Sequence, residues 1–164
     1  MHRHRTPEDH DELARLDGAV LGLLVDPDDH RPWSETEIAR EISTPGSVPE
    51  CLERLRDGGL VHRCCCGLVV ASHAATRCYD IEQGHGPREE QRSLEDMILG
   101  LALEHPVSEG PPSREDFVAE LGDDRRLTII DALDSLRGAG LIDRSGEFVT
   151  PSRAARTYSQ IAIA

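Results

Sequence analysis

The sequence contains no lysine, so all 18 of its basic residues are arginine, and 31 acidic residues outnumber them. We read the missing lysine as a compositional bias without chemical meaning. The formal net charge of −13 matters more, because binding to phosphate groups requires clustered positive charge. The acidic surplus therefore argues against a nucleic-acid partner, and its simplest role is to keep the protein soluble.

Aromatic residues are scarce as well, with one tryptophan, two tyrosines and two phenylalanines. Without them, a base-stacking platform for single-stranded nucleic acid is not expected. No hydrophobic run approaches the length of a membrane span, and the first residues lack the apolar segment of a secretory signal. We therefore expect a cytoplasmic protein without a membrane partner, whose five cysteines stay reduced.

Motifs that mark common enzyme classes are missing too. The sequence has no glycine-rich phosphate loop, no G-x-S-x-G nucleophile elbow and no H-E-x-x-H zinc motif. Its many carboxylates are scattered over expected helix faces, and two small cores leave little room for a deep pocket. We expect neither enzymatic activity nor a cofactor.

The chain carries an internal repeat. Four blocks of the first half recur in the second half in the same order. "AVLGLL" (19–24) matches "MILGLA" (97–102), and "WSETEIAREI" (33–42) matches "PSREDFVAEL" (112–121). Further on, "VPECLERLRDGGLVHR" (48–63) matches "IIDALDSLRGAGLIDR" (129–144), and "GLVVASHAATR" (67–77) matches "GEFVTPSRAAR" (146–156). The nearly constant offsets of 78, 79, 81 and 79 residues indicate a duplication.

Each copy predicts three helices, a two-stranded hairpin and a last helix. Ser34 and Glu37 form the pattern of a capping box at the second helix. The third helix has apolar residues at helical spacing, and in this alignment Cys51 takes the place of Ala132, which predicts a small buried residue. Glycines end both third helices. The last helix is expected to begin near Ser72 in copy one, and at Pro151 in copy two.

The predicted fold class is therefore mainly α with short β-hairpins (α+β), arranged as two tandem domains. Residues 1–11 are expected to form a disordered tail, followed by a first domain over 12–82. A polar stretch with glycine and proline makes 83–91 the linker, and the second domain covers 92–164.

Three helices followed by a hairpin form the winged helix-turn-helix arrangement. The block "WSETEIAREI" with "LRDGGLVHR" resembles winged-helix transcriptional regulators of the PadR and MarR groups. The ending "GEFVTPSRAAR" is similar to that of small actinobacterial winged-helix proteins. The resemblance implies that the third helix enters the major groove of DNA and that the hairpin touches the adjacent backbone.

The leading hypothesis is a DNA-binding transcriptional regulator whose two copies form a pseudo-dimer within one chain, with homodimerisation as a further option. Double-stranded DNA would then be the partner. Candidate contacts are the arginines of the third helices, hairpins and last helices, together with one threonine: Arg125, Arg126, Thr128, Arg137, Arg144, Arg153, Arg156, Arg54 and Arg63. For each arginine, the simpler interpretation is a solvated surface residue balanced by nearby acids.

The competing hypothesis is an acidic winged-helix adaptor that binds a protein and not DNA. Carboxylates dominate the outward positions of both third helices, and a reader of base edges usually presents arginine, lysine or amide side chains there. Both hairpins are also short. Tandem winged-helix modules serve as protein-binding platforms in other proteins, for example in the kleisin-binding subunit of bacterial condensin complexes.

Three consecutive cysteines, Cys64, Cys65 and Cys66, fall at the expected hairpin turn of copy one. His62 shares a strand face with Cys64, and Cys78 lies downstream. These five residues are candidates for metal binding or redox sensing. However, zinc sites usually use separated pairs of ligands, and copy two has no equivalent. An exposed, reduced turn is the simpler interpretation.

Overall fold

The computed structural model describes residues 7–43, 46–86 and 88–162. The described residues form eight α-helices and two antiparallel β-hairpins, which confirms the predicted class, mainly α with short β-hairpins (α+β). They divide into two compact units. Unit 1 comprises Met1–Thr76 and Thr157–Ala164, and unit 2 comprises Arg77–Arg156. No helix of the described chain is long and apolar enough to cross a bilayer.

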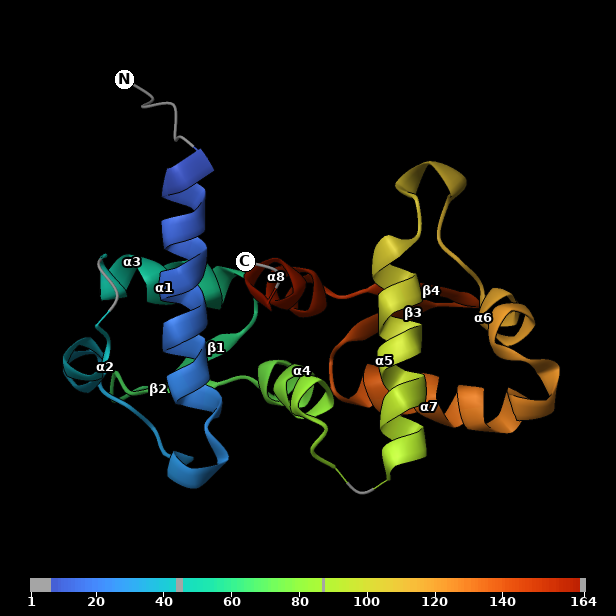
Figure 1. The fold of residues 1–164 in the computed structure, drawn as a ribbon, viewed down its shortest axis with the longest axis horizontal. Coiled ribbons are helices and arrows are strands. Elements are labelled where there is room, and N and C mark those ends of the chain that lie inside the picture. Colours follow the sequence, from blue (N-terminus) through green and yellow to red (C-terminus); the bar gives the residue numbers. More distant parts are fainter. Residues whose placement is uncertain (1–6, 44–45, 87, 163–164) are drawn as a thin grey trace. The chain divides into compact units, whose positions relative to one another are not determined.

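Unit 1 contains three helices and a hairpin. These are α1 (Pro7–Val25), α2 (Glu35–Glu41), α3 (Val48–Asp57), β1 (Val61–Arg63) and β2 (Val69–Ala71), with the short 3-10 helix η1 (Pro27–Asp29) after α1. Helix α1 crosses α3 (Figure 1). The apolar faces of these helices meet in a core that includes Leu16, Val20, Leu24, Leu52 and Leu55, all nearly inaccessible to solvent.

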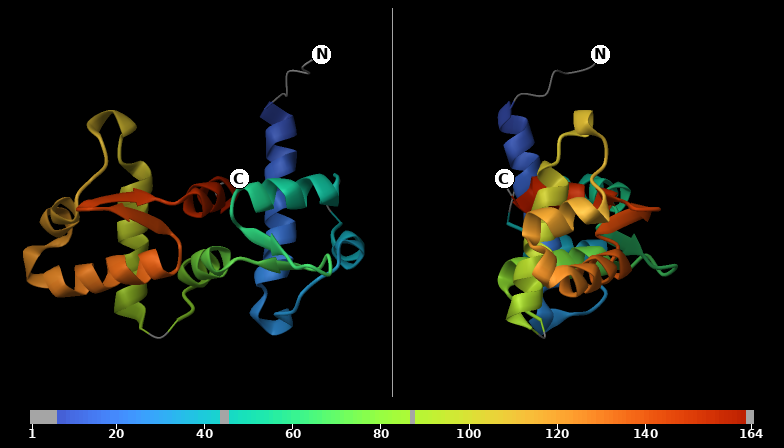
Figure 2. Two further views of the ribbon diagram at one scale, coloured as in Figure 1. Left: turned by 180° about the vertical axis from the view of Figure 1, so that it is seen from behind. Right: turned by 90° about the vertical axis from the view of Figure 1, so that its right-hand side faces the viewer.

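Unit 2 repeats this order. It contains α5 (Glu89–Glu104), α6 (Arg114–Leu121), α7 (Arg126–Gly138), β3 (Ile142–Ser145) and β4 (Phe148–Pro151), with the 3-10 helices η2 (Val107–Glu109) and η3 (Asp123–Arg125). The view from behind shows α7 leading into its hairpin as α3 leads into the first one (Figure 2, left). Cys51 and Ala132 are both fully buried at matching positions, which confirms that Cys51 fills the core.

The last helix of each repeat crosses the boundary between the units. Helix α4 (His73–Gln83) begins in unit 1 and continues in unit 2 from Arg77. Helix α8 (Arg153–Ala162) begins in unit 2, and its residues from Thr157 belong to unit 1. There Thr157 packs so closely on Gly58 that a Cβ atom at position 58 would lie 2.6 Å from the Thr157 Cγ2 atom.

Helix ends follow from local chemistry. Leu60 N–H donates to the Leu55 carbonyl at 2.8 Å, and Leu141 N–H donates to the Leu136 carbonyl at 2.9 Å. In both places a glycine with positive φ, Gly59 or Gly140, precedes the donor. This is the Schellman arrangement, which ends α3 and α7 as the glycines predicted.

Both second helices open with a complete capping box, at Ser34–Glu37 and at Ser113–Asp116. Hydrogen bonds from the Ser34 backbone N–H and hydroxyl, with the Arg31 guanidinium, lower the pKa of Glu37 to about 2.

We expect the Glu37 carboxylate to titrate near pH 2 by NMR in the folded protein. Because this pKa is depressed, the stabilisation is present above the usual glutamate pKa and disappears as the pH falls toward 2. A Ser34→Ala variant should raise the pKa of Glu37, and an unchanged pKa would contradict the assignment of the low value to the capping box.

The loop of the first hairpin is one residue longer than that of the second, and not two residues longer as the sequence alignment predicted. The alignment was therefore wrong here. Arg63 pairs with Val69 across five residues, whereas Arg144 pairs with Val149 across four. The second strands and last helices therefore match at an offset of 80, as the N-terminal caps show. Ala75 N–H donates to the Ser72 hydroxyl, and Ala155 N–H donates to the Ser152 hydroxyl.

Two expected boundaries also need correction. Residues 7–11, expected in a disordered tail, belong to α1, while residues 1–6 lie outside the described part. Pro151 ends β4 and does not open α8, whose N-cap is Ser152. The polar residues 7–11 thus continue α1 toward its N-terminal end, and Pro151 continues β4 by one residue.

Candidate functional site

The outward face of α7 and the adjacent hairpin form the surface that the DNA hypothesis assigns to base and phosphate contacts. Leu127, Thr128, Asp131, Asp134 and Arg137 are exposed along α7. Two of these five side chains are carboxylates, and one is a large apolar residue. This composition differs from the amide and guanidinium groups that usually read base edges.

Arg126, at the first position of α7, is held by carboxylates. Its Nη2 atom lies 2.5 Å from Glu115 Oε1, and its Nη1 atom lies 3.4 Å from Asp123 Oδ1. The hydrogen bond to Glu115 is the main cause that raises the pKa of Arg126. A phosphate group that approached Arg126 would have to compete with both acids.

The hairpin arginines are paired in the same way in both units. Arg144 on β3 donates from Nη1 to Asp134 on α7 at 2.8 Å. Arg63 on β1 donates to Glu35 at 3.1 Å and lies 3.9 Å from Glu53 on α3. Glu53 and Asp134 occupy equivalent positions of the third helices. The duplication therefore repeats an ion pair between hairpin and third helix, next to the place where DNA would bind.

Arg54 was expected on the outward face of α3, but its guanidinium points inward. Its Nε and Nη2 atoms donate to both oxygens of Asp17 on α1, at 3.1 and 2.5 Å. The hydrogen bond to Asp17 raises the pKa of Arg54. Burial, helped by Asp17, raises the pKa of the Cys51 thiol. Arg54 thus links α3 to α1, and the expectation that its side chain points outward is wrong.

The remaining arginine candidates divide into two groups, and Thr128 is considered with them. Arg125 and Arg137 lie in no ion pair among the described residues. Arg153 and Arg156, on α8, each take part in an interaction within the described structure. Thr128 is exposed on α7. Only Arg125 and Arg137 therefore offer guanidinium groups on the third-helix side of unit 2 without a described carboxylate beside them.

Exposed apolar side chains distinguish unit 2 from unit 1. Among the described residues, the large apolar side chains that are exposed are Met97, Val107, Leu127 and Phe148, and all four belong to unit 2. Leu127 is 77% exposed and Phe148 is 50% exposed. Phe148 bridges to Ser113, the N-cap of α6, and Leu127 follows Arg126, which bonds to Glu115 in the first turn of α6.

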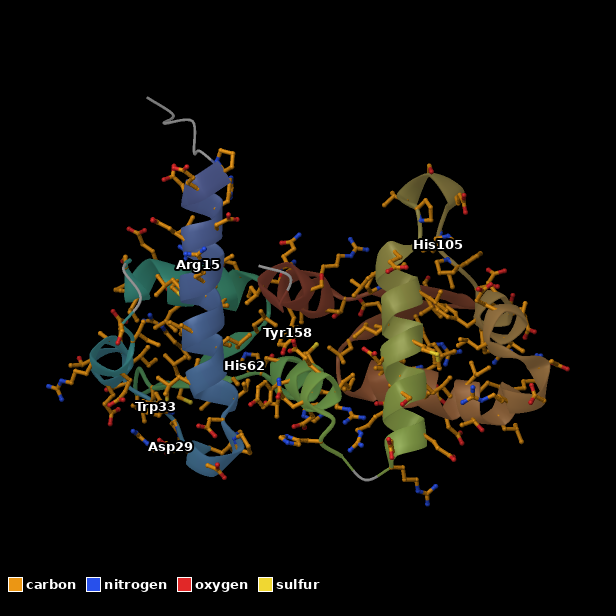
Figure 3. The ribbon with its side chains drawn as sticks, viewed as in Figure 1. Arg15, Asp29, Trp33, His62, His105 and Tyr158 are labelled. Atoms are coloured by element: carbon orange, nitrogen blue, oxygen red, sulfur yellow. The ribbon has the colours of Figure 1, made fainter. Side chains whose placement is uncertain are left out.

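The thiols do not form a metal site. No group of three or more His, Cys, Asp or Glu side chains is placed to hold a metal ion within the described residues. His62, on β1 (Figure 3), and Cys64, Cys65 and Cys66 are exposed. Cys78 is buried in α4, where burial, helped by Glu82, raises its pKa to about 12. Gly67 N–H donates to the Cys64 carbonyl at 2.9 Å, so the triplet forms a tight turn.

This arrangement predicts two classes of thiol. At pH 8 we expect Cys64, Cys65 and Cys66 to react within seconds to minutes with an aromatic disulfide reagent. Cys51 and Cys78 should react only on unfolding, because burial and a raised pKa suppress their thiolate. Absorbance of the released thiol counts both classes. A variant with serine at 64, 65 and 66 should lose the fast class, and a remaining fast reaction would contradict the assignment.

The sequence analysis did not predict that the acids Asp17 and Glu95 are buried and paired with arginines. Both lie one residue after a buried leucine on the first helix of their copy, at an offset of 78. The signal that could have identified them is an acid repeated on an otherwise apolar helix face, which indicates an internal ion pair.

Comparison with known proteins finds no matching family model, no matching curated protein and no matching solved structure.

Proposed function

We propose that this chain is a tandem winged-helix protein that acts as an acidic protein-binding adaptor, with its partner-binding surface on unit 2. The single observation that carries the proposal is the pairing of Arg63, Arg126 and Arg144 with carboxylates on their own surfaces. Phosphate recognition depends on unpaired positive charge. These surfaces instead present ion pairs surrounded by further acids.

The adaptor surface has the composition expected of a protein interface. Leu127 and Phe148 supply exposed apolar area, and the exposed carboxylate of Asp131 lies one helical turn after Leu127 on α7. Large apolar residues in the centre with a polar rim are typical of such interfaces. A partner with apolar side chains and surplus positive charge complements this surface.

The adaptor hypothesis predicts that acids mask the arginines from DNA. We expect no salt-sensitive binding of the wild-type protein to a duplex of mixed sequence at low ionic strength, measured by fluorescence anisotropy. Changing Glu35→Gln, Glu115→Gln and Asp134→Asn together removes the hydrogen-bonded carboxylate of each arginine and three negative charges, and should produce binding that weakens steeply with salt. As a control, Glu104→Gln, Glu120→Gln and Asp96→Asn remove the same charge elsewhere and should produce much weaker binding.

The partner itself can be captured from the native cell. A photo-crosslinking residue at position 127 should yield one dominant adduct, whereas the same residue at exposed position 96 should not. Phe148→Asp, in the crosslinker variant, should reduce the adduct at least tenfold because it places charge in the apolar centre. An adduct that Phe148→Asp leaves unchanged would argue against this surface.

A DNA-binding transcriptional regulator is the second candidate, and Arg125 and Arg137 favour it. They leave guanidinium groups on the third-helix side of unit 2 without a described ion-pair partner. Two units in one chain would then supply two half-sites. Salt-sensitive DNA binding by the wild-type protein that disappears in Arg125→Glu with Arg137→Glu would support this candidate and overturn the adaptor.

A further inference from the structure

The two units neutralise the same buried acid in different ways. Asp17 on α1 and Glu95 on α5 occupy equivalent positions, and both are buried. Glu95 pairs with Arg77 of α4, while Asp17 pairs with Arg54 of α3. The arginine comes from the last helix of a repeat in unit 2 and from the third helix in unit 1. Unit 1 therefore has no arginine at the position on α8 that corresponds to Arg77 on α4.

In unit 2 the space beside the acid is filled by the chain itself. The Arg77 guanidinium donates to Glu95 Oε2, and the Gln91 amide donates to Glu95 Oε1 at 3.0 Å. Arg77 is only 16% exposed in this pair, so its side chain lies mostly inside the unit. Gln91, Glu95 and Arg77 form a packed polar cluster.

In unit 1 the equivalent space is a groove of about 410 Å³. The offset of 80 set by the caps makes Thr157 the equivalent of Arg77, and Leu13 is the equivalent of Gln91. Leu13, Asp17 and Thr157 all line the groove. A short threonine therefore stands where unit 2 has a long arginine, and the groove lies beside the Asp17–Arg54 pair, in which both Asp17 oxygens accept from Arg54.

We propose that the groove of unit 1 is a binding site for an alkylguanidinium group, the chemistry of the side chain that fills the equivalent space in unit 2. The guanidinium is carried either by a free small molecule or by an arginine of a peptide. The inference does not depend on the proposed function, because it concerns unit 1 and not the surface of unit 2.

The charges and walls of the groove fit such a ligand. With the histidine of the lining, His10, counted as neutral, Asp11, Asp17 and Arg54 give the groove a formal charge of −1, which a single cation balances. The Gln160 amide supplies a carbonyl acceptor, and Leu13, Ala14, Leu55 and Ile161 supply apolar contacts for an aliphatic chain. The volume lies within the range of about 300–1,000 Å³ that small-molecule sites have.

Isothermal titration calorimetry of the full chain with butylguanidinium chloride tests the proposal. We expect saturable binding of one ligand with a dissociation constant of about 1 mM or lower. Sodium butyrate at equal ionic strength should not bind. Titration with N-acetylarginine amide identifies the source, because tighter binding of this probe points to a peptide and weaker binding to a free small molecule, and either result supports the site.

The decisive variant is Thr157→Arg, which rebuilds the side chain of unit 2 in unit 1. We expect it to fill the groove and weaken butylguanidinium binding at least tenfold. Ser159→Arg adds the same charge to α8 away from the groove lining and should bind as the wild type does. Asp11→Asn, a substitution at an exposed position, should also weaken binding, which keeps the test valid if Thr157→Arg does not fold. Absence of saturable binding, equal binding by Thr157→Arg, or binding of butyrate would overturn the proposal.

Discussion

The Arg77→Ala variant should lose about 3–5 kcal/mol of unfolding free energy in unit 2, the cost of leaving one partner of a buried ion pair unpaired. Glu95 is inaccessible to solvent, so it cannot recover its hydration when the guanidinium is removed. Urea unfolding followed by circular dichroism measures the loss. Since small domains have only about 5–15 kcal/mol of stability, unit 2 should be largely unfolded at moderate urea.

The control for this prediction replaces both partners. Arg77→Met with Glu95→Leu removes the charge pair and keeps the volume, and such replacements are often neutral or stabilising. Arg54→Met in unit 1 should cost less, because Asp17 keeps 13% side-chain exposure and can still reach water. A loss in Arg77→Ala below about 1 kcal/mol would mean that the pair is solvated like a surface salt bridge.

The second large effect comes from a matched pair of core residues. Leu52 and Leu133 are equivalent, and both are almost fully buried. Truncating either one to alanine should cost about 2–5 kcal/mol through lost burial and the cavity left behind. Each change should destabilise its own unit, because Leu52 belongs to unit 1 and Leu133 to unit 2.

Trp33 makes the two units distinguishable. It is the single tryptophan of the sequence, and it is buried in unit 1. Tryptophan fluorescence therefore follows the unfolding of unit 1, whereas circular dichroism follows both units. We expect Leu52→Ala to shift the transition seen by fluorescence. We expect Leu133→Ala to leave that transition unchanged and to shift a transition seen only by circular dichroism. Equal shifts of both probes in both variants would show instead that the chain unfolds as one cooperative block.

Local chemistry allowed much of the fold to be predicted. The repeat, the capping boxes, the glycines that end the third helices and the burial of Cys51 all depend on residues within a few positions of one another. The hairpin offset was wrong because the loops "RCCCGLV" and "RSGEFV" align equally well with one or two residues of difference. A shift of one residue moves every side chain to the other face of a strand, so Val149 and not Phe148 is buried as the equivalent of Val69.

The sequence by itself determined which segments become helices and hairpins, because periodicity, caps and turn glycines act over short distances along the chain. Only the tertiary structure decided what the charged side chains do. An arginine reaches several ångströms and pairs with whichever carboxylate packing brings near it, such as Asp17 for Arg54 or Glu95 for Arg77. Those carboxylates lie 37 and 18 residues away along the chain, so no local pattern could identify them.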